Sequence, residues 1–252
     1  MICYDYFLFI GGKMKNFIFI CLVSTSLVVF ANNHDEPNYS KFQANYFFNC
    51  PVEPACGAAF DKLMKSPEVA KENFEASLLR VSHAGSSDIT HSIQFYYKSA
   101  ERYQRAGEVF SNSKAFAEFG QSMAQAGAQP VYNNLTSYLI AEGDGRKSTA
   151  GVTFTANVSN PAVYAPAFAK MAKKMFKEPF GGNSYVLRVE HLGNGSSTHS
   201  VSVSFDDGAA ALEFLANYPN TPQFQEFVQE AGTSFESGLS YMTTNLLDYN
   251  PD

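Results

Sequence analysis

The feature of this chain that most constrains its fold is a segment that occurs twice. The stretch LRVSHAGSSDITHS begins at Leu79 and LRVEHLGNGSSTHS begins at Leu187, so the two copies are 108 residues apart. The same offset, without a gap, relates further pairs: Asn49 and Asn157, Phe60 and Phe168, Phe119 and Phe227. A period this long lies outside the range of about 20–50 residues that is typical of solenoid repeats. The chain is therefore predicted to contain one domain written twice.

Each copy carries the same order of predicted elements. In the second copy, apolar and polar residues alternate from Val152 to Val158, which is typical of a strand with one buried face, and a helical segment follows from Pro161. The hairpin comes next, with Gly, Ser and Asn in its turn, and then a helical region and a last strand. The predicted order is β-α-β-β-α-β, the split βαβ or ferredoxin-like unit.

These patterns divide the chain into four segments. They are a signal peptide at 1–31, a polar leader at 32–43, a first ferredoxin-like repeat at 44–143 and a second at 150–248. The junction GDGRKS between the repeats, which begins at Gly143, is polar and Gly-rich, as flexible linkers are.

The N-terminal segment is typical of an export signal. From Met14, an alternative start, a Lys-bearing end precedes an apolar run, and Val29 and Ala31 fit cleavage after Ala31. The run is short for a membrane span of about 20 residues, and an uncleaved anchor is the alternative. We expect an exported protein, periplasmic or secreted, without a membrane segment after cleavage. Cys50 and Cys56 then remain, and either a disulfide or two free thiols fits the sequence.

The element order resembles that of a known group of proteins. A β-α-β-β-α-β unit whose second helix reads P-x-F-x-x-F, here from Pro222 to Phe227, is similar to the dimeric α+β barrel superfamily, which includes the antibiotic-biosynthesis-monooxygenase-like proteins. There, two units pack sheet against sheet. The resemblance implies an α+β fold in which tandem ferredoxin-like repeats form an intramolecular dimeric α+β barrel. A monomer with an internal pseudo-dimer is then expected.

The alternation within the hairpins sorts their residues onto two faces. Leu79 and Val81 lie on the apolar face, which is expected to pack under helices. Arg80 and its counterpart Arg188 lie on the polar face, which is expected to point between the two sheets. Burying a guanidinium without a partner is costly, so two in one lumen imply an anionic ligand or internal carboxylates; a self-satisfied polar interior is the alternative. The predicted lumen residues are Asn49, Asn157, Arg80, Arg188, Thr90, Thr198, Ser92, Ser200 and Glu190.

The hairpin histidines form a second candidate group, which comprises His83, His91, His191 and His199. Imidazole binds Zn, Cu, Fe and Ni, so a metal site at the hairpins is one hypothesis. A metal site usually has three or four convergent ligands, and neither pair has a carboxylate or thiolate at a convincing spacing. The alternative is a structural histidine that fastens the hairpin loop.

Charge and motifs narrow the function. The net charge is -6 and no block of Lys or Arg occurs, so the electrostatic footprint of a nucleic-acid-binding protein is absent. The chain has no Gly-x-Ser-x-Gly motif and no phosphate-binding Gly loop. We therefore expect an exported small-molecule-binding or interaction protein with an unidentified ligand. The sequence requires no cofactor, and it assigns no reaction.

The resemblance implies an alternative function, a cofactor-independent monooxygenase or haem-binding enzyme with its site in the lumen. Haem-degrading relatives use an Asn on the first strand, a His on a helix and a Trp. Asn49 and Asn157 lie at comparable first-strand positions. However, the histidines of the two repeats lie on the hairpins and the chain has no Trp, which departs from the haem-degrading pattern.

Overall fold

The structure is a computed structural model that describes residues 40–193 and 197–249. The predicted signal peptide and most of the polar leader lie outside these ranges. Within them, no helix is both long enough and apolar enough to cross a membrane.

The described chain alternates strands and helices in two series. The first series is β1 (Phe42–Asn49), α1 (Glu53–Met64), α2 (Pro67–Ala70), β2 (Glu75–Ser82), β3 (His91–Tyr97), α3 (Ala100–Asn112), α4 (Lys114–Gln125) and β4 (Gln129–Gly143). The second is β5 (Ala150–Val158), α5 (Pro161–Met175), β6 (Ser184–Gly193), β7 (His199–Phe205), α6 (Gly208–Asn217), α7 (Pro222–Ala231) and β8 (Phe235–Tyr249), with 3₁₀ turns at Tyr218–Asn220 and Gly232–Ser234.

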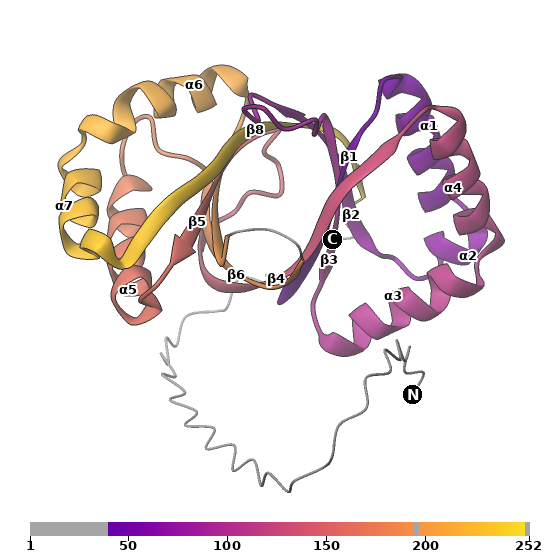
Figure 1. Ribbon diagram of the computed structural model, residues 1–252, viewed down its shortest axis with the longest axis horizontal. Helices are drawn as coiled ribbons and strands as arrows, with labels where there is room; N and C mark the ends of the chain where they lie inside the picture. Colours follow the sequence, from indigo (N-terminus) through magenta and orange to yellow (C-terminus); the bar gives the residue numbers. More distant parts are fainter. Residues whose placement is uncertain (1–39, 194–196, 250–252) are drawn as a thin grey trace, which may run out of the picture. The chain divides into compact units, whose positions relative to one another are not determined.

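The eight strands form one closed antiparallel barrel. The strands of the first series lie in the order β4-β1-β3-β2 and those of the second in the order β8-β5-β7-β6. The pairs β2–β8 and β4–β6 join the two sheets, so no strand edge is left open. Helices α1–α4 cover the outside of one sheet and α5–α7 cover the outside of the other (Figure 1). The α+β barrel expected from the resemblance is therefore confirmed, and the structure adds that its eight strands close.

Polar side chains fix the starts of α3, α4, α6 and α7. Ser99, Ser113, Asp207 and Thr221 each accept a hydrogen bond from the backbone N–H three residues further on, which satisfies a donor that the helix itself leaves unpaired.

Each sheet has its own apolar core between its outer face and its helices. Phe60 and Leu78 are fully buried in the first core, and Phe168 and Leu187 in the second. A third, smaller cluster includes two residues, Phe47 and Tyr241, that also line the lumen; it consists of Phe47, Val81, Ala84, Ile89 and Tyr241.

The two hairpins pair in registers that differ by one residue. In the first hairpin His91 lies opposite Arg80, whereas in the second its counterpart His199 lies opposite Val189. The loop of the first hairpin is one residue longer than that of the second. His83 (φ 57°) and Gly85 (φ 61°) of this loop adopt left-handed backbone conformations that accommodate the extra residue. A slip of one residue exchanges the two faces of a strand. The expected faces are therefore correct for β6 and wrong for β2.

Candidate ligand-binding sites

The barrel lumen is lined mainly by polar side chains of both sheets. Gln43 Nε2 donates to Asn45 Oδ1 (2.6 Å) and to Gln94 Oε1 (3.0 Å). Asn45 Nδ2 continues the chain to Asn134 Oδ1 at 2.7 Å, and the Tyr138 hydroxyl donates to Gln43 Oε1 at 3.0 Å. Most polar side chains in the middle of the lumen thus hydrogen-bond one another, and the cavity left there is about 20 Å³.

Arg188 is the buried cation of this lumen. Its side chain comes from β6, and the residue is only 8% exposed. Nη1 donates to Ser202 Oγ at 2.8 Å, and the guanidinium carbon lies 4.9 Å from the centre of the Tyr138 ring. Nε is buried and has no hydrogen-bond acceptor among the residues that the structure describes. Glu190, two residues along the same face, accepts instead from Ser197 at 3.1 Å, and burial raises the pKa of its carboxyl.

The predicted lumen residues occupy different places. Arg188, Glu190 and Ser200 line the lumen, and Ser92 is fully buried opposite Leu79. Asn49 is half-buried at the end of β1, and Asn157 is exposed at the end of β5. Neither asparagine lines one of the three cavities of the described chain. The asparagines that line the lumen are Asn45, Asn134 and Asn245, which the sequence prediction missed.

The two threonines end their strands in the same way. The hydroxyl of Thr90 accepts from the Cys50 N–H and that of Thr198 from the Val158 N–H, both at 2.8 Å. Each hydroxyl also bonds Nδ1 of the next residue, a histidine, at 2.8 Å. Both threonines are thus placed as strand-end anchors.

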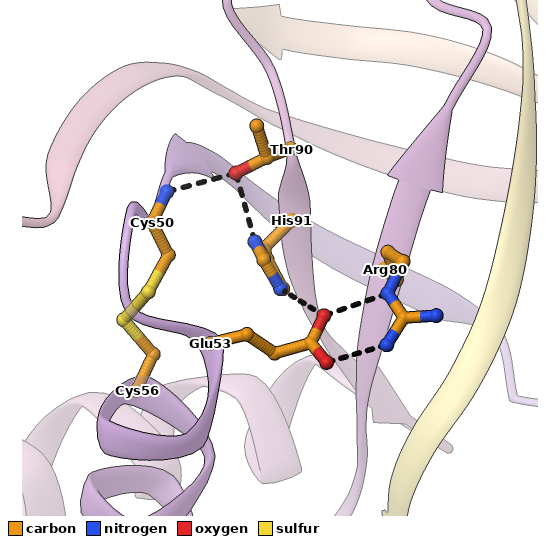
Figure 2. Close-up of a disulfide and its surroundings, with 6 residues drawn as sticks. All are labelled: Cys50, Glu53, Cys56, Arg80, Thr90 and His91. Atoms are coloured by element: carbon orange, nitrogen blue, oxygen red, sulfur yellow. Dashed lines mark hydrogen bonds and ion pairs between the residues drawn. A yellow bond between two sulfur atoms is a disulfide. The ribbon is translucent and has the colours of Figure 1, made fainter.

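Arg80 does not face the lumen, and the expectation that it shares this space with Arg188 is wrong. The one-residue register difference turns Arg80 outward, where Nε and Nη2 hold the carboxylate of Glu53 at 2.7 and 2.5 Å (Figure 2). Leu79 occupies the inward position instead, opposite Ser92. Glu53 stands in the first turn of α1, a position that the sequence analysis did not single out.

A hydrogen-bonded chain runs from this ion pair to the disulfide (Figure 2). His91 Nε2 lies 3.0 Å from Glu53 Oε2, and its Nδ1 bonds Thr90, which accepts from Cys50. A carboxylate only accepts, so Nε2 carries the proton and Nδ1 accepts from the threonine. Cys50 and Cys56 form a disulfide with their Cα atoms 6.7 Å apart. The hydrogen bonds to Arg80 and to His91 lower the pKa of Glu53 to about 2.

The four histidines do not converge. His91 packs on Phe48 and His199 on Tyr164, so each belongs to the core of a different sheet. His83 and His191 are exposed, and His191 Nε2 bonds Ser137 Oγ at 2.7 Å. In the described ranges, no three His, Cys, Asp or Glu side chains are grouped so as to hold a metal ion. The metal hypothesis thus has no ligand set in this part of the chain.

A large apolar pocket lies outside the barrel, between the first sheet and α4; we call it the α4 pocket. Its volume is about 780 Å³. Its wall contains seven phenylalanines and two tyrosines, namely Phe47, Phe48, Phe60, Phe95, Phe110, Phe116, Phe119, Tyr46 and Tyr132. Helix α4 buries none of its residues, whereas its counterpart α7 buries Phe227 and Ala231. The apolar side chains of α4 are therefore only partly covered, and they form one wall of the pocket.

The second half fills the corresponding space with its own side chains. Phe154, which lies 108 residues after Tyr46, packs on Tyr218 with ring centres 5.6 Å apart. Tyr218 in turn stacks on Phe214 at 4.7 Å. Tyr46 is instead 45% exposed, so its ring is open to an incoming ligand. The α4 pocket was missed by the sequence analysis because its residues read as ordinary core positions.

A histidine-ligated haem does not fit the α4 pocket. The described wall contains Met123 and the two tyrosines as groups able to bind iron, but no histidine. His91 lies behind Phe48, and both of its ring nitrogens are already hydrogen-bonded. In this half the first-strand Asn49 is not in the wall either.

Comparison with known proteins supports the fold and goes no further. No protein-family model matches the chain, and no curated protein matches it. Among solved structures it resembles a candidate monooxygenase from Fusobacterium nucleatum, with 12% identity, a TM-score of 0.56 and coverage of 85% of this chain and 100% of the other. A candidate monooxygenase from Lactobacillus acidophilus (9%, 0.54, 85% and 100%) and an anthrone oxidase-like protein (13%, 0.53, 83% and 92%) are similar to the same extent. These likenesses show the dimeric α+β barrel fold, and a fold alone does not imply a function.

Proposed function

We propose that this protein binds an apolar, ring-containing small molecule in the α4 pocket. The observation that carries the proposal is the pocket itself, about 780 Å³ of space with an aromatic wall. Ligand pockets are typically about 300–1,000 Å³ and mainly apolar. Each square ångström of apolar ligand surface that leaves water contributes about 25 cal/mol. Aromatic rings in the wall favour flat ring systems, since ring pairs add about 0.5–1.5 kcal/mol beyond burial.

Binding is favoured over catalysis by the chemistry of the wall. General acid–base catalysis needs a group that exchanges a proton near neutral pH. In the described wall the ionisable groups are Tyr46 and Tyr132, and burial raises the pKa of both hydroxyls. Both therefore stay protonated at neutral pH and serve as hydrogen-bond donors that orient a ligand. A monooxygenase is the alternative function, which the names of two of the similar structures suggest.

The binding test uses a substitution that fills the pocket. Gly120 of α4 lies in the pocket wall, and a Cβ added there meets nothing within 4 Å. Gly120→Leu therefore adds a side chain at the wall without a clash and with a better helix former. We expect the uncharged ring dye Nile red to bind the wild type with a Kd in the micromolar range, and the variant at least about tenfold more weakly.

The matched control is Gly107→Leu. Gly107 lies on α3 away from the pocket wall, and a Cβ there also meets nothing within 4 Å. It should leave dye binding unchanged. Equal binding by Gly120→Leu, with an unchanged circular dichroism spectrum, would contradict the proposal.

Anthrone separates binding from oxygenation, because it is a three-ring apolar probe of the right class. A change in the Trp fluorescence of the Phe116→Trp variant on addition of anthrone, without oxygen uptake, supports a binding protein. The chain has no other Trp, so this signal reports on position 116. If the wild type takes up oxygen in the presence of anthrone and Gly120→Leu does not, the protein is a monooxygenase rather than a binding protein. A Soret shift with haemin would revive the haem alternative.

We also propose that the chain arose by duplication of one ferredoxin-like unit and that the mature protein is exported. The strand orders β4-β1-β3-β2 and β8-β5-β7-β6 support the duplication, as do the matching anchors of Thr90 and Thr198. The Cys50–Cys56 disulfide supports an oxidising compartment.

A further inference from the structure

We propose that the barrel lumen is a second binding site, for a small zwitterion of the α-amino-acid class. The site is a chamber at one end of the lumen, with a volume of about 240 Å³. Beyond the chamber the lumen narrows to a cavity of about 20 Å³, which is lined in part by Phe47 and Tyr241 of the apolar cluster. Strands of both sheets line it, and the β4–β5 linker with Asp144 and Arg146 borders its mouth. It is separate from the α4 pocket, which lies outside the barrel.

The chamber contains a buried cation that lacks an anion. Arg188 lines both the chamber and the small cavity below it, so it lies deep. Among the described residues no carboxylate lies within 4.0 Å of its guanidinium, and Nε has no acceptor. A buried, unpaired charge is unfavourable, and a guanidinium pairs best with a planar carboxylate. The deep end of the chamber therefore selects a ligand carboxylate.

Two carboxylates stand in the same chamber. Glu75 of β2 accepts from the Ser40 hydroxyl at 3.4 Å, and Asp248 of β8 accepts from the Ser77 hydroxyl at 2.7 Å. Burial raises the pKa of both acids, because neither is fully solvated. Their charges repel a simple anion and attract an ammonium group, in competition with Lys98 and Arg146, whose charges lower the pKa of Glu75. A ligand with one carboxylate and one ammonium matches Arg188 and the two acids at once.

The size of the chamber limits the rest of the ligand. Its volume lies below the lower bound of about 300 Å³ for drug-sized ligands, and its remaining wall is largely hydroxyl-bearing, with Ser184, Ser202 and Ser204. A side chain no larger than a few atoms fits this space. Glycine, L-alanine and L-serine are therefore the probes, and L-phenylalanine is the size control.

The experiment is isothermal titration calorimetry of the full chain with each probe. We expect at least one of the three small amino acids to bind, and propionate and ethylamine, which each carry one of the two charges, to bind at least about tenfold more weakly. L-Phenylalanine should not bind. Arg188→Gln and Glu75→Gln should each weaken binding at least about tenfold, whereas Lys173→Gln, which removes a positive charge from the exposed surface of α5, should not.

Nile red titration of the same variants shows that they are folded, because the α4 pocket does not involve the lumen charges. The proposal is overturned if none of the three amino acids binds at about 10 mM, if propionate binds as well as L-alanine, or if Glu75→Gln binds as tightly as the wild type. Failure of dye binding alone would remove the α4 pocket and leave the lumen site standing.

Discussion

At the scale of single residues, the two halves share one anchor and differ in what is attached to it. Each half has a histidine whose Nδ1 bonds a strand-end threonine. In the first half Glu53 and Arg80 extend this series of hydrogen bonds. In the second half position 161, the counterpart of Glu53, is a proline. Burial lowers the pKa of both His91 and His199, so both rings stay neutral around neutral pH. The Glu53 network is therefore a device that stabilises the first half.

Substitution of Glu53 tests this interpretation. Glu53→Gln removes the ion pair with Arg80 and the acceptor of the buried His91, so we expect the free energy of unfolding at pH 7 to fall by about 1–2 kcal/mol, a value already reduced for the partial solvent exposure of the carboxylate. The folded pKa of about 2 lies below the ordinary value of 4.5. The contribution is thus complete above about pH 4.5 and disappears as the pH falls towards about 2.

Urea unfolding of both proteins across this pH range measures the difference. Glu118→Gln is the control, because it breaks only exposed ion pairs with Lys62 and Lys114. It should cost clearly less than Glu53→Gln. A difference between wild type and Glu53→Gln that stays constant from pH 7 down to pH 2 would show that the carboxylate charge is not the cause.

At the scale of elements, the sequence determined the order of strands and helices but not how the strands of one hairpin pair. The 108-residue offset is correct for β3 and β7, yet β2 and β6 correspond at an offset of 109, as Leu79 and Arg188 show. The alternation of apolar and polar residues defines the two faces of a strand but does not say which face points into the barrel. One extra residue in the loop exchanges the two faces. For this reason Arg188 could be placed from sequence and Arg80 could not.

For a similar reason the α4 pocket could not be predicted from the sequence. Phe116 and Phe119 have the helical spacing of a core stripe, and the counterparts Phe224 and Phe227 pack into the second core. Phe116 is 39% exposed because it lines the open α4 pocket. Such a space depends on the side chains of several elements together and has no local sequence pattern.

The disulfide is the element-scale feature that only the first half has. It joins the residue after β1 to the first turns of α1, which also carry Glu53. The double variant Cys50→Ala/Cys56→Ala should lose about 2 kcal/mol of stability, the chain-entropy value for so short a loop, and its melting temperature should fall by about 4–8 °C.

Differential scanning calorimetry with and without dithiothreitol checks this prediction. The reductant should lower the melting temperature of the wild type and leave that of the double variant unchanged. If the wild type does not respond to reduction, the bridge contributes nothing to stability. Tryptic mapping gives an independent readout, because the peptide of residues 42–62 contains both cysteines and is lighter by two hydrogen atoms when they are bridged.

At the scale of the whole barrel, closure depends on two seams between the sheets. β4–β6 and β2–β8 are long antiparallel pairs, and both occur within one chain. Residues from both sheets also meet in the lumen, where Ser77 of β2 donates to Asp248 of β8 and Arg188 of β6 lies on Tyr138 of β4. Neither sheet can therefore leave the other without exposing two strand edges and a polar interior. The barrel should be a monomer that unfolds in one step.

Division of the chain at the β4–β5 linker tests the seams. The fragments 1–146 and 147–252, produced together, should associate as a one-to-one complex, because each carries two open edges that match those of the other. Light scattering after size-exclusion chromatography measures the mass, and a tag on one fragment should retain the other. Produced alone, each fragment should pair with itself or aggregate, since its edges remain unpaired. Stable monomeric fragments that do not associate would contradict this account, because they would show that each sheet folds without the other.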